Sequence, residues 1–232
     1  SVYVNFENNQ LLEHLFEKDF DMERILLELQ IATHTTITPT TLLLFDELQE
    51  VKRGVTALKY FQELLPDQPI IAAGSLLGIA MHRDDSFPVG KVDFLTLYPM
   101  SFFEFSEAMG EQLLVKQLKD QRWDIINTYS SRLETLLRQY FYVGGMPEVV
   151  SAFVQNKDFV QVRTIQQAIL DSYDHDFSKH APLKDLAKIR WIWDSVPVQL
   201  AKENNKFVFS HVKEGKRSAE LEDALQWLKD SG

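Results

Sequence analysis

The sequence contains no cysteine. This excludes disulfide bonds, zinc sites with cysteine ligands and thiol catalysis, and it fits a reducing compartment. The chain also lacks a run of about 18 apolar residues and a basic leader followed by an apolar stretch. We therefore expect a soluble, cytoplasmic protein with no membrane partner.

An excess of positive charge is missing as well, since the 232 residues carry a net charge of −10. Residues 1–110 contain 7 Lys or Arg and 17 Asp or Glu, whereas residues 111–232 contain 17 of each. Non-specific binding of nucleic acid depends on Lys and Arg that neutralise phosphates. The first half is therefore predicted to be a poor surface for nucleic acid, and the second half offers at most a local one.

The most informative stretch that is present runs from Thr41 to Glu50, an apolar run that ends in Asp46 and Glu47. An apolar run of this length that ends in charge indicates a central parallel strand, whose carboxyl end opens onto solvent. Ligands of open α/β sheets bind at that end. In a P-loop nucleotidase the first acid there holds Mg²⁺ and the second orients or deprotonates the attacking water. Asp46 and Glu47 fit these roles in this order.

A second buried strand is predicted over residues 69–73, after an amphipathic helix over 55–65, and it ends in Gly74 and Ser75. A right-handed β-α-β unit would place Ser75 beside Asp46, where its hydroxyl could act as a sensor of the γ-phosphate or the attacking water. The alternative is that Gly74 and Ser75 only turn the chain into the next helix.

The other patterns predict mixed structure up to about residue 110 and mainly helices thereafter. Further strands are expected at residues 2–6, 92–97 and 206–209. Further helices are expected at 11–17, 22–31, after a capping box of Ser101 and Glu104, at 112–119, 125–142, after Pro147, and at 159–177, 183–203 and 218–230. We divide the chain into an α/β core (1–110), a helical lid (111–205) and a final segment (206–232).

Several short motifs recur in an order and spacing that resemble a known family, the prokaryotic AAA-type P-loop ATP-binding proteins with a domain of unknown function after the ATPase core. The resemblance implies a truncated parallel-sheet core, an all-α lid and the start of a winged-helix unit. The motifs are Asn5-Phe6-Glu7, Leu44-Phe45-Asp46-Glu47-Leu48-Gln49-Glu50, Gly74-Ser75, Pro88-Val89-Gly90-Lys91-Val92, Tyr98-Pro99-Met100-Ser101-Phe102-Phe103-Glu104-Phe105 and Gly144-Gly145-Met146-Pro147-Glu148-Val149-Val150.

The same resemblance implies ATP and Mg²⁺ as ligands, Asp46 and Glu47 as the Walker B acids, and Ser75 as the sensor residue. Lys91 stands where relatives usually have arginine, and lysine cannot copy the planar, bidentate guanidinium. We keep Lys91 and Arg83 as candidate phosphate contacts, with a structural salt bridge as the alternative for Lys91. The segment from Gly144 to Glu148 resembles a hinge between core and lid; the alternative is that glycine freedom and a helix that starts at Pro147 explain it.

One requirement of the family is not met by the sequence. Phosphate binding needs a glycine-rich loop followed by Lys and then Ser or Thr. Gly90-Lys91 is followed by Val92, and Gly215-Lys216 is followed by Arg217. We therefore expect an internal piece of a longer ATPase, without its Walker A loop, that binds ATP weakly or not at all when alone.

Two other functions are open from the sequence. The helical and winged-helix half could be a non-enzymatic module that binds a protein, a second copy of the chain or DNA. The cations at 213–217 favour phosphates, but the acids at 220–223 oppose DNA. A metal-dependent hydrolase built on acids and histidines between 171 and 180 is weaker, because His175 and His180 lie on different faces of a helix. A solvated helix end explains these residues better.

Overall fold

The protein is described by a computed structural model that covers residues 1–74, 90–202, 206–215 and 217–231. By its internal contacts the chain divides into two units. The first consists of Ser1–Phe94 and Ala181–Gly232, and the second of Leu95–His180. The division near residues 110 and 205 stays a prediction.

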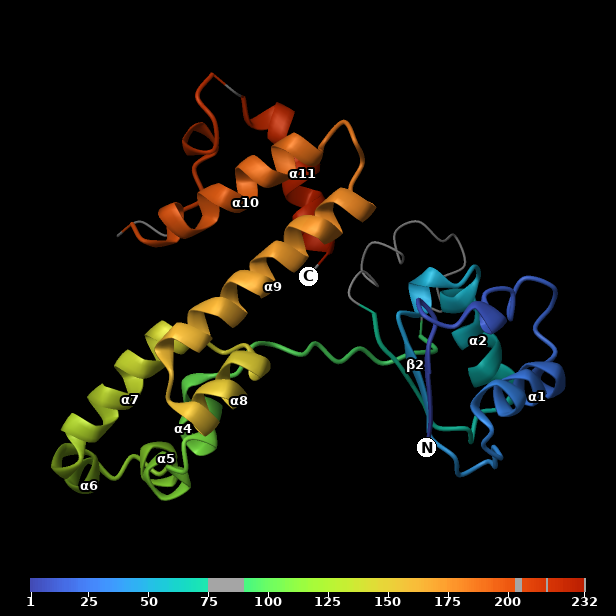
Figure 1. Ribbon diagram of the computed structural model, residues 1–232, viewed down its shortest axis with the longest axis horizontal. Helices are drawn as coiled ribbons and strands as arrows, with labels where there is room; N and C mark the ends of the chain where they lie inside the picture. Colours follow the sequence, from blue (N-terminus) through green and yellow to red (C-terminus); the bar gives the residue numbers. More distant parts are fainter. Residues whose placement is uncertain (75–89, 203–205, 216, 232) are drawn as a thin grey trace. The chain divides into compact units, whose positions relative to one another are not determined.

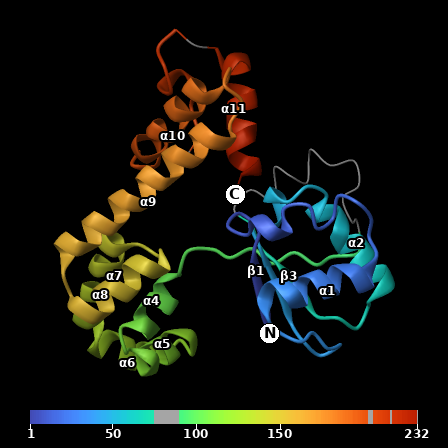
Figure 2. The same ribbon diagram turned by 45° about the vertical axis from the view of Figure 1, so that its right-hand side comes forward.

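The first unit contains a small parallel sheet of three strands in the order β1-β2-β3. The strands are β1 (Val2–Asn5), β2 (Leu43–Asp46) and β3 (Ile70–Ala72). The connecting helices α1 (Met22–Thr33) and α2 (Gly54–Leu64) lie together on one side of the sheet (Figures 1 and 2). This arrangement confirms an α/β fold for this part of the chain and the three strands expected at residues 2–6, before Asp46 and at 69–73.

Alternation along the strands shows which face of the sheet is packed. Val2, Val4 and Phe45 are almost fully buried, whereas Tyr3 is 60% exposed and Ile71 is 55% exposed. Successive side chains of a strand point to opposite faces, so the valines and Phe45 meet the helices while Tyr3 lies on the other face. The polar side chains of β1 can therefore reach the end of β2.

Aromatic rings form much of this core. The ring of Phe45 lies 5.5 Å from that of Phe6 and 5.7 Å from that of Phe61 on α2, centroid to centroid. Ile25 and Leu29 of α1 are fully buried in the same cluster. Each such side chain contributes about 1.5–3 kcal/mol when it leaves water. Packing of Phe45 against the helices thus fixes the carboxyl end of β2.

Helix α1 starts where the sequence predicted it, at Met22. The prediction of a helix at residues 11–17 is wrong. Asp21 caps α1 by accepting a hydrogen bond of 3.0 Å from the Glu23 N–H. Before it, only a 3₁₀ turn forms (η1, Gln10–Leu12). Arg24 donates to the carbonyl oxygens of Leu15 (3.0 Å) and Asp19 (3.1 Å), so this side chain satisfies carbonyls of an irregular segment. The apolar spacing there reflects core packing.

The second unit is helical, and it has one more helix than the sequence indicated because the pattern at 125–142 is interrupted at Tyr129. Its helices are α4 (Phe102–Ala108), α5 (Gln112–Lys119), α6 (Trp123–Thr128), α7 (Ser130–Val143), α8 (Pro147–Asn156) and α9 (Phe159–His180). Phe105 of α4 is fully buried among residues of α5, α7, α8 and α9.

The capping box predicted at the start of α4 is confirmed. The Ser101 N–H donates to Glu104 Oε2 over 2.7 Å, and the Glu104 N–H donates to Ser101 Oγ over 3.3 Å. Hydrogen bonds from the Ser101 N–H and hydroxyl hold the pKa of Glu104 below its usual value. The reciprocal bonds satisfy two backbone donors at the helix start.

Two of the short motifs meet within this unit, at Met100 and Gly145. The Met100 N–H donates to the Gly145 carbonyl over 2.7 Å, and the Tyr140 hydroxyl donates to the Met100 carbonyl over 2.9 Å. A Cβ at Gly145 would lie 2.3 Å from the Met100 oxygen. Gly145 is therefore needed for close backbone approach, a role that the hinge interpretation did not include.

The strand expected at residues 92–97 is wrong, because these residues form no strand. Leu95 and Leu97 are 87% and 88% exposed. A strand requires a neighbour that takes its backbone hydrogen bonds, and hydropathy does not reveal whether that neighbour exists. Among the described residues, β3 pairs with β2 alone.

The end of the chain forms helices α10 (Leu186–Leu200) and α11 (Ser218–Asp230), which pack against each other. Between them lies a 3₁₀ turn, η3 (Phe209–His211), where a short strand was expected at 206–209. The backbone N–H of Val208 instead donates to the Gln199 side chain over 2.6 Å. A winged helix stays a prediction. In the described parts of the chain, no helix has the length and apolar character needed to cross a membrane.

We expect Gly145→Ala to lower the free energy of unfolding by about 1–3 kcal/mol, because the new Cβ collides with the Met100 backbone. Urea unfolding followed by the helical circular dichroism signal measures this. Ser151→Ala, at an exposed position of α8, is the control. Equal stability of the two variants would contradict the close approach of Met100 and Gly145.

Candidate functional site

Asp46 lies at the carboxyl end of β2, directly opposite Asn5 in the parallel register of β1 and β2. The Asn5 side-chain amide donates to Asp46 Oδ2 over 3.1 Å, and the Tyr3 hydroxyl donates to the same oxygen. The Glu47 backbone N–H donates to Asp46 Oδ1 over 3.1 Å. Three donors therefore hold this half-buried carboxylate in one orientation.

Tyr3 is the unexpected member of this group. Its hydrogen bond to Asp46 is the main reason why the pKa of Tyr3 is raised, and the nearby charges of Asp46 and Glu47 act in the same direction. A phenol that donates to a carboxylate loses its proton less readily, since the phenolate would repel the acid. The hydrogen bond therefore favours the protonated form of Tyr3.

Glu47 begins a tight turn that continues into η2 (Leu48–Glu50). Its backbone is left-handed, with φ of 50°, which is uncommon for a residue with a side chain. The Leu48 N–H donates to the Ala73 carbonyl over 3.3 Å, so the turn is tied to the end of β3. The Gln49 side-chain amide donates to Glu47 Oε2. Glu47 is therefore adjacent to Asp46 but held by different partners.

The remaining predicted site residues are only partly covered by the structure. Ser75 and Arg83 lie outside the described residues, so their assignments stay predictions. Lys91 Nζ lies 3.8 Å from Glu63 Oε1, and both side chains are more than one third exposed. Such a surface pair contributes about 0–1 kcal/mol. Glu63 is thus a partner for the structural salt bridge considered for Lys91, and a phosphate contact of Lys91 stays a prediction.

The donor set of Asp46 fits an indirect role toward Mg²⁺. A carboxylate has about four acceptor sites, of which the three hydrogen bonds occupy three. Mg²⁺ keeps several waters and takes one or two carboxylates besides substrate phosphates. Asp46 could accordingly accept a hydrogen bond from a water on Mg²⁺. Among the residues that the structure describes, no three His, Cys, Asp or Glu side chains gather as a metal-binding group, which leaves the histidines of α9 without support.

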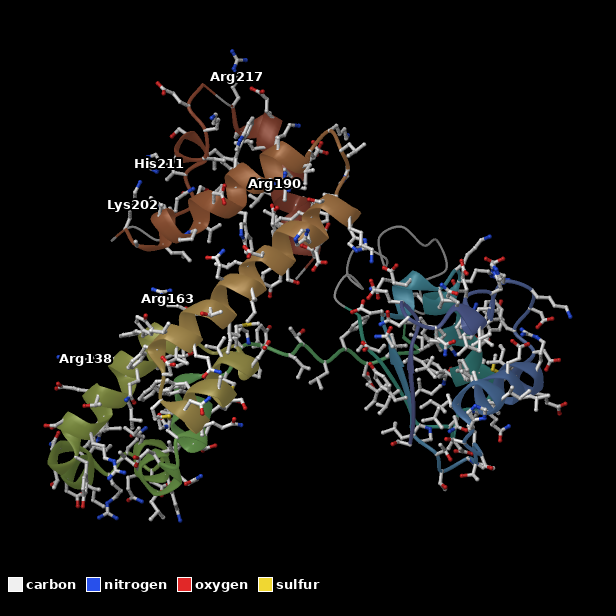
Figure 3. The ribbon with its side chains drawn as sticks, in the orientation of Figure 1. Arg138, Arg163, Arg190, Lys202, His211 and Arg217 are labelled. Carbon is white, nitrogen blue, oxygen red and sulfur yellow. The ribbon has the colours of Figure 1, made fainter. Side chains whose placement is uncertain are left out.

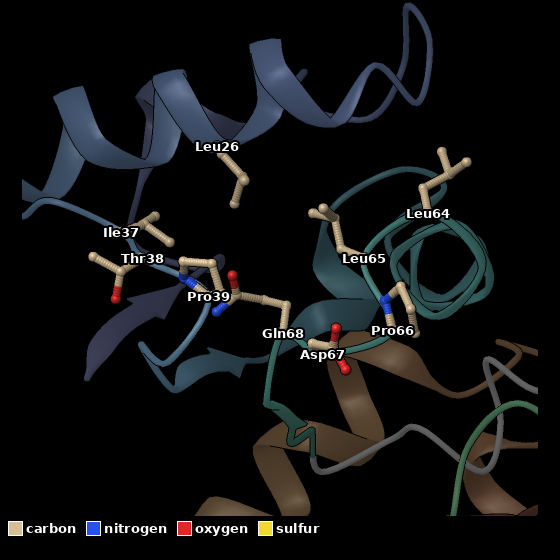
Figure 4. A pocket seen from close by; sticks show the side chains of 9 residues that line it. All are labelled: Leu26, Ile37, Thr38, Pro39, Leu64, Leu65, Pro66, Asp67 and Gln68. Atoms are coloured by element: carbon tan, nitrogen blue, oxygen red, sulfur yellow. The ribbon is translucent and has the colours of Figure 1, made fainter.

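A pocket of about 260 Å³ lies near the amino ends of strands β2 and β3, opposite to the ends at which Asp46 and Glu47 lie (Figure 4). It is formed by the loops before β2 and β3 together with Leu26 of α1, and its lining includes Pro39, Leu65 and Gln68. Ligands of parallel sheets bind at the carboxyl ends of the strands. The pocket is therefore separate from Asp46 and Glu47.

Sequence reasoning missed Tyr3, Asn5 and Gln49 as parts of the site. The alternation of Val2 and Val4 with Tyr3 and Asn5 was the available signal, because it places both polar residues on one face of β1. No pattern signalled Gln49, whose contact depends on the turn after Asp46.

We expect Tyr3 to titrate above the ordinary tyrosine pKa of about 10, because its hydroxyl donates a hydrogen bond to Asp46. The raised folded-state pKa stabilises the fold at neutral pH, and this contribution is lost as the pH rises through that pKa. The difference in tyrosinate absorbance between the wild type and Tyr3→Phe reports the titration. Asp46→Asn should lower this pKa, and Glu50→Gln is the control. An unshifted titration in the wild type would contradict the hydrogen bond.

Comparison with known proteins separates the chain into two matched regions. Residues 1–106 match the AAA domain family, and residues 134–232 match a domain of unknown function (DUF8612). No curated protein and no solved structure matches the chain. The AAA domain match covers the sheet and the Asp46 turn, and it indicates a nucleotide-binding, P-loop-like ATPase domain.

Proposed function

We propose that this protein takes part in Mg²⁺-dependent hydrolysis of ATP, with the site at the carboxyl end of β2. The observation that carries the proposal is the oriented pair of acids, in which Asp46 is held by Tyr3 and Asn5 and is followed directly by Glu47. The match of residues 1–106 to the AAA domain family supports nucleotide use.

In this proposal Asp46 would hold Mg²⁺ through a water, and the ion, when bound, would neutralise negative charge on the nucleotide phosphates. Glu47 orients the attacking water and accepts its proton. The water oxygen forms a bond to the γ-phosphorus while the bond from that phosphorus to the β–γ bridging oxygen breaks. The bonding electron pair leaves with ADP. Ser75 is assigned as the sensor, and Lys91 and Arg83 as phosphate contacts.

The phosphate cradle has to come from outside the 232 residues in this proposal. Backbone N–H groups of a glycine-rich loop, a lysine and a hydroxyl are the groups that bind nucleotide phosphates in such sites. None of the glycines in the sequence is followed by Lys and then Ser or Thr. The activity is therefore expected of the protein as its source cell makes it, rather than of these residues alone. An intact mass well above 26.9 kDa would support this.

We expect Glu47→Gln to retain ATP and to lower kcat about 100-fold or more, because the amide cannot accept the proton of water. Asp46→Asn should instead weaken the dependence of nucleotide binding on Mg²⁺. Phosphate release and fluorescent nucleotide binding, measured on protein from the source cell, test both. Glu50→Gln, an exposed acid of the same turn, is the control. Unchanged turnover in Glu47→Gln would remove Glu47 from the mechanism.

A second candidate function, binding of duplex DNA, has one observation in its favour. The segment between α10 and α11 carries exposed basic side chains, of which Figure 3 labels Lys202, His211 and Arg217. Lys202 Nζ lies 3.0 Å from His211 Nδ1, and Lys213 Nζ lies 5.3 Å from the centre of the Trp191 ring. Phosphates attract such a group of cations.

Two acids of α11 lie near a lysine of the neighbouring helix. The pKa of Lys188 on α10 is raised, first by its hydrogen bond to Asp185 and then by Asp223 and Glu220. These two acids of α11 therefore act partly on a lysine of the neighbouring helix. The positive segment between the helices is the surface that we assign to phosphates.

We expect Lys202→Gln combined with Arg217→Gln to weaken duplex DNA binding. The slope of log affinity against log salt should fall by about 0.9 for each phosphate that the variant no longer neutralises. Fluorescence anisotropy at several salt concentrations measures this. Lys18→Gln, on the acidic half, is the control. If the wild type binds no duplex DNA, or binds an acidic protein instead, the DNA function is wrong.

A further inference from the structure

Gln49 follows the acidic pair closely in the sequence, and its side chain contacts Glu47. It lies in η2, two residues after Glu47, and its side-chain Nε2 donates to Glu47 Oε2. The side chain is half-buried. Its other polar atom, Oε1, is buried and has no hydrogen-bond partner among the described residues.

The orientation of this amide follows from chemistry. An ionised carboxylate only accepts hydrogen bonds, so the amide must turn its NH₂ group toward Glu47. Oε1 then has to point away from Glu47 and stays without a donor. A buried acceptor without a donor destabilises a fold, and an apolar side chain of similar size would avoid that penalty. Stability therefore does not account for glutamine at this position, whereas the contact with Glu47 does.

The backbone is fixed at the residues directly before and after Gln49. Leu48 is fully buried, and its N–H is tied to the end of β3 through Ala73. Gly54 approaches so closely that a Cβ there would lie 2.5 Å from the Leu48 carbonyl oxygen. The Glu50 N–H donates to the Glu47 carbonyl over 2.9 Å, which closes the turn. Gln49 thus reaches Glu47 from a rigid position.

We propose that Gln49 is a positioning residue for Glu47, and that its hydrogen bond to one carboxylate oxygen orients the carboxylate for the attacking water. This inference rests on the proposed ATPase function. The Gln49 donor holds one oxygen of the carboxylate and occupies one of its about four acceptor sites. Small displacements of a group that acts on a reacting water lower the rate strongly.

The test uses Gln49→Leu and Gln49→Glu in the protein as its source cell makes it. Leucine removes the donor, and glutamate places a like charge against Glu47. We expect both variants to lower kcat about 10-fold or more, while KM for ATP stays within about twofold, because nucleotide binding is not affected. Gln10→Leu, at an exposed position of η1, is the control and should leave kcat unchanged.

Thermal stability separates positioning from a structural role. Gln49→Leu should melt at the wild-type temperature or above it, because the buried orphan Oε1 is removed. A loss of stability in parallel with kcat would assign Gln49 a structural role and overturn the inference. An increase in kcat would also overturn it, because Gln49 would then restrain Glu47.

The two proposals fail in different ways. If the wild type hydrolyses ATP and Gln49→Leu does so equally well, the inference about Gln49 is wrong and the ATPase function stands. If the wild type has no ATPase activity, both are wrong. The contact itself is read by NMR: the side-chain amide protons of Gln49 should exchange more slowly than those of Gln10, and Glu47→Ala should remove this protection.

Discussion

The candidate site depends on the parallel register that places Asn5 beside Asp46. The Phe6 N–H donates to the Asp46 carbonyl over 3.0 Å, and the Ala73 N–H donates to the Phe45 carbonyl over 2.7 Å, so β2 is held on both edges up to its last residue. A shift of one residue would turn Val2 and Val4 away from the helices and Tyr3 and Asn5 into the core. The hydrophobic packing that fixes the register therefore also assembles the polar contacts of Asp46.

In the helical unit a close backbone approach has the corresponding role. Met100 lies one residue before the cap of α4, and Gly145 lies between α7 and α8, so their hydrogen bond joins segments that are 45 residues apart. Only glycine fits where a Cβ would touch the Met100 oxygen. The adjacent Gly144 has φ of 75°, a conformation that also favours glycine. Packing and turn geometry together explain this pair of glycines without requiring movement.

The sequence predicted those features that local rules determine, which include the three strands of the sheet, the capping box and helices α1, α2 and α11. The predictions failed where the structure of a segment depends on its contacts with another part of the chain. Residues 92–97 have the composition of a strand but form none, and residues 13–19 form no helix, with the carbonyl groups of Leu15 and Asp19 bound by Arg24. Asp46 and Glu47 were identified from the apolar run before them. Tyr3 and Gln49 were not, because their contacts depend on the register of two strands and on the shape of one turn.

The turn after Asp46 combines two locally unfavourable features within three residues. Glu47 is left-handed although it has a side chain, and Gln49 leaves an acceptor buried without a donor among the described residues. Each costs stability, and such features persist where the surrounding structure compensates for them. Leu48, fully buried between the two residues, supplies that compensation together with the close approach of Gly54. A glycine at 47 and an apolar residue at 49 would relieve both, but they would remove the carboxylate and its donor. The chemistry proposed for Glu47 would explain why this turn is not built from the residues that would stabilise it most.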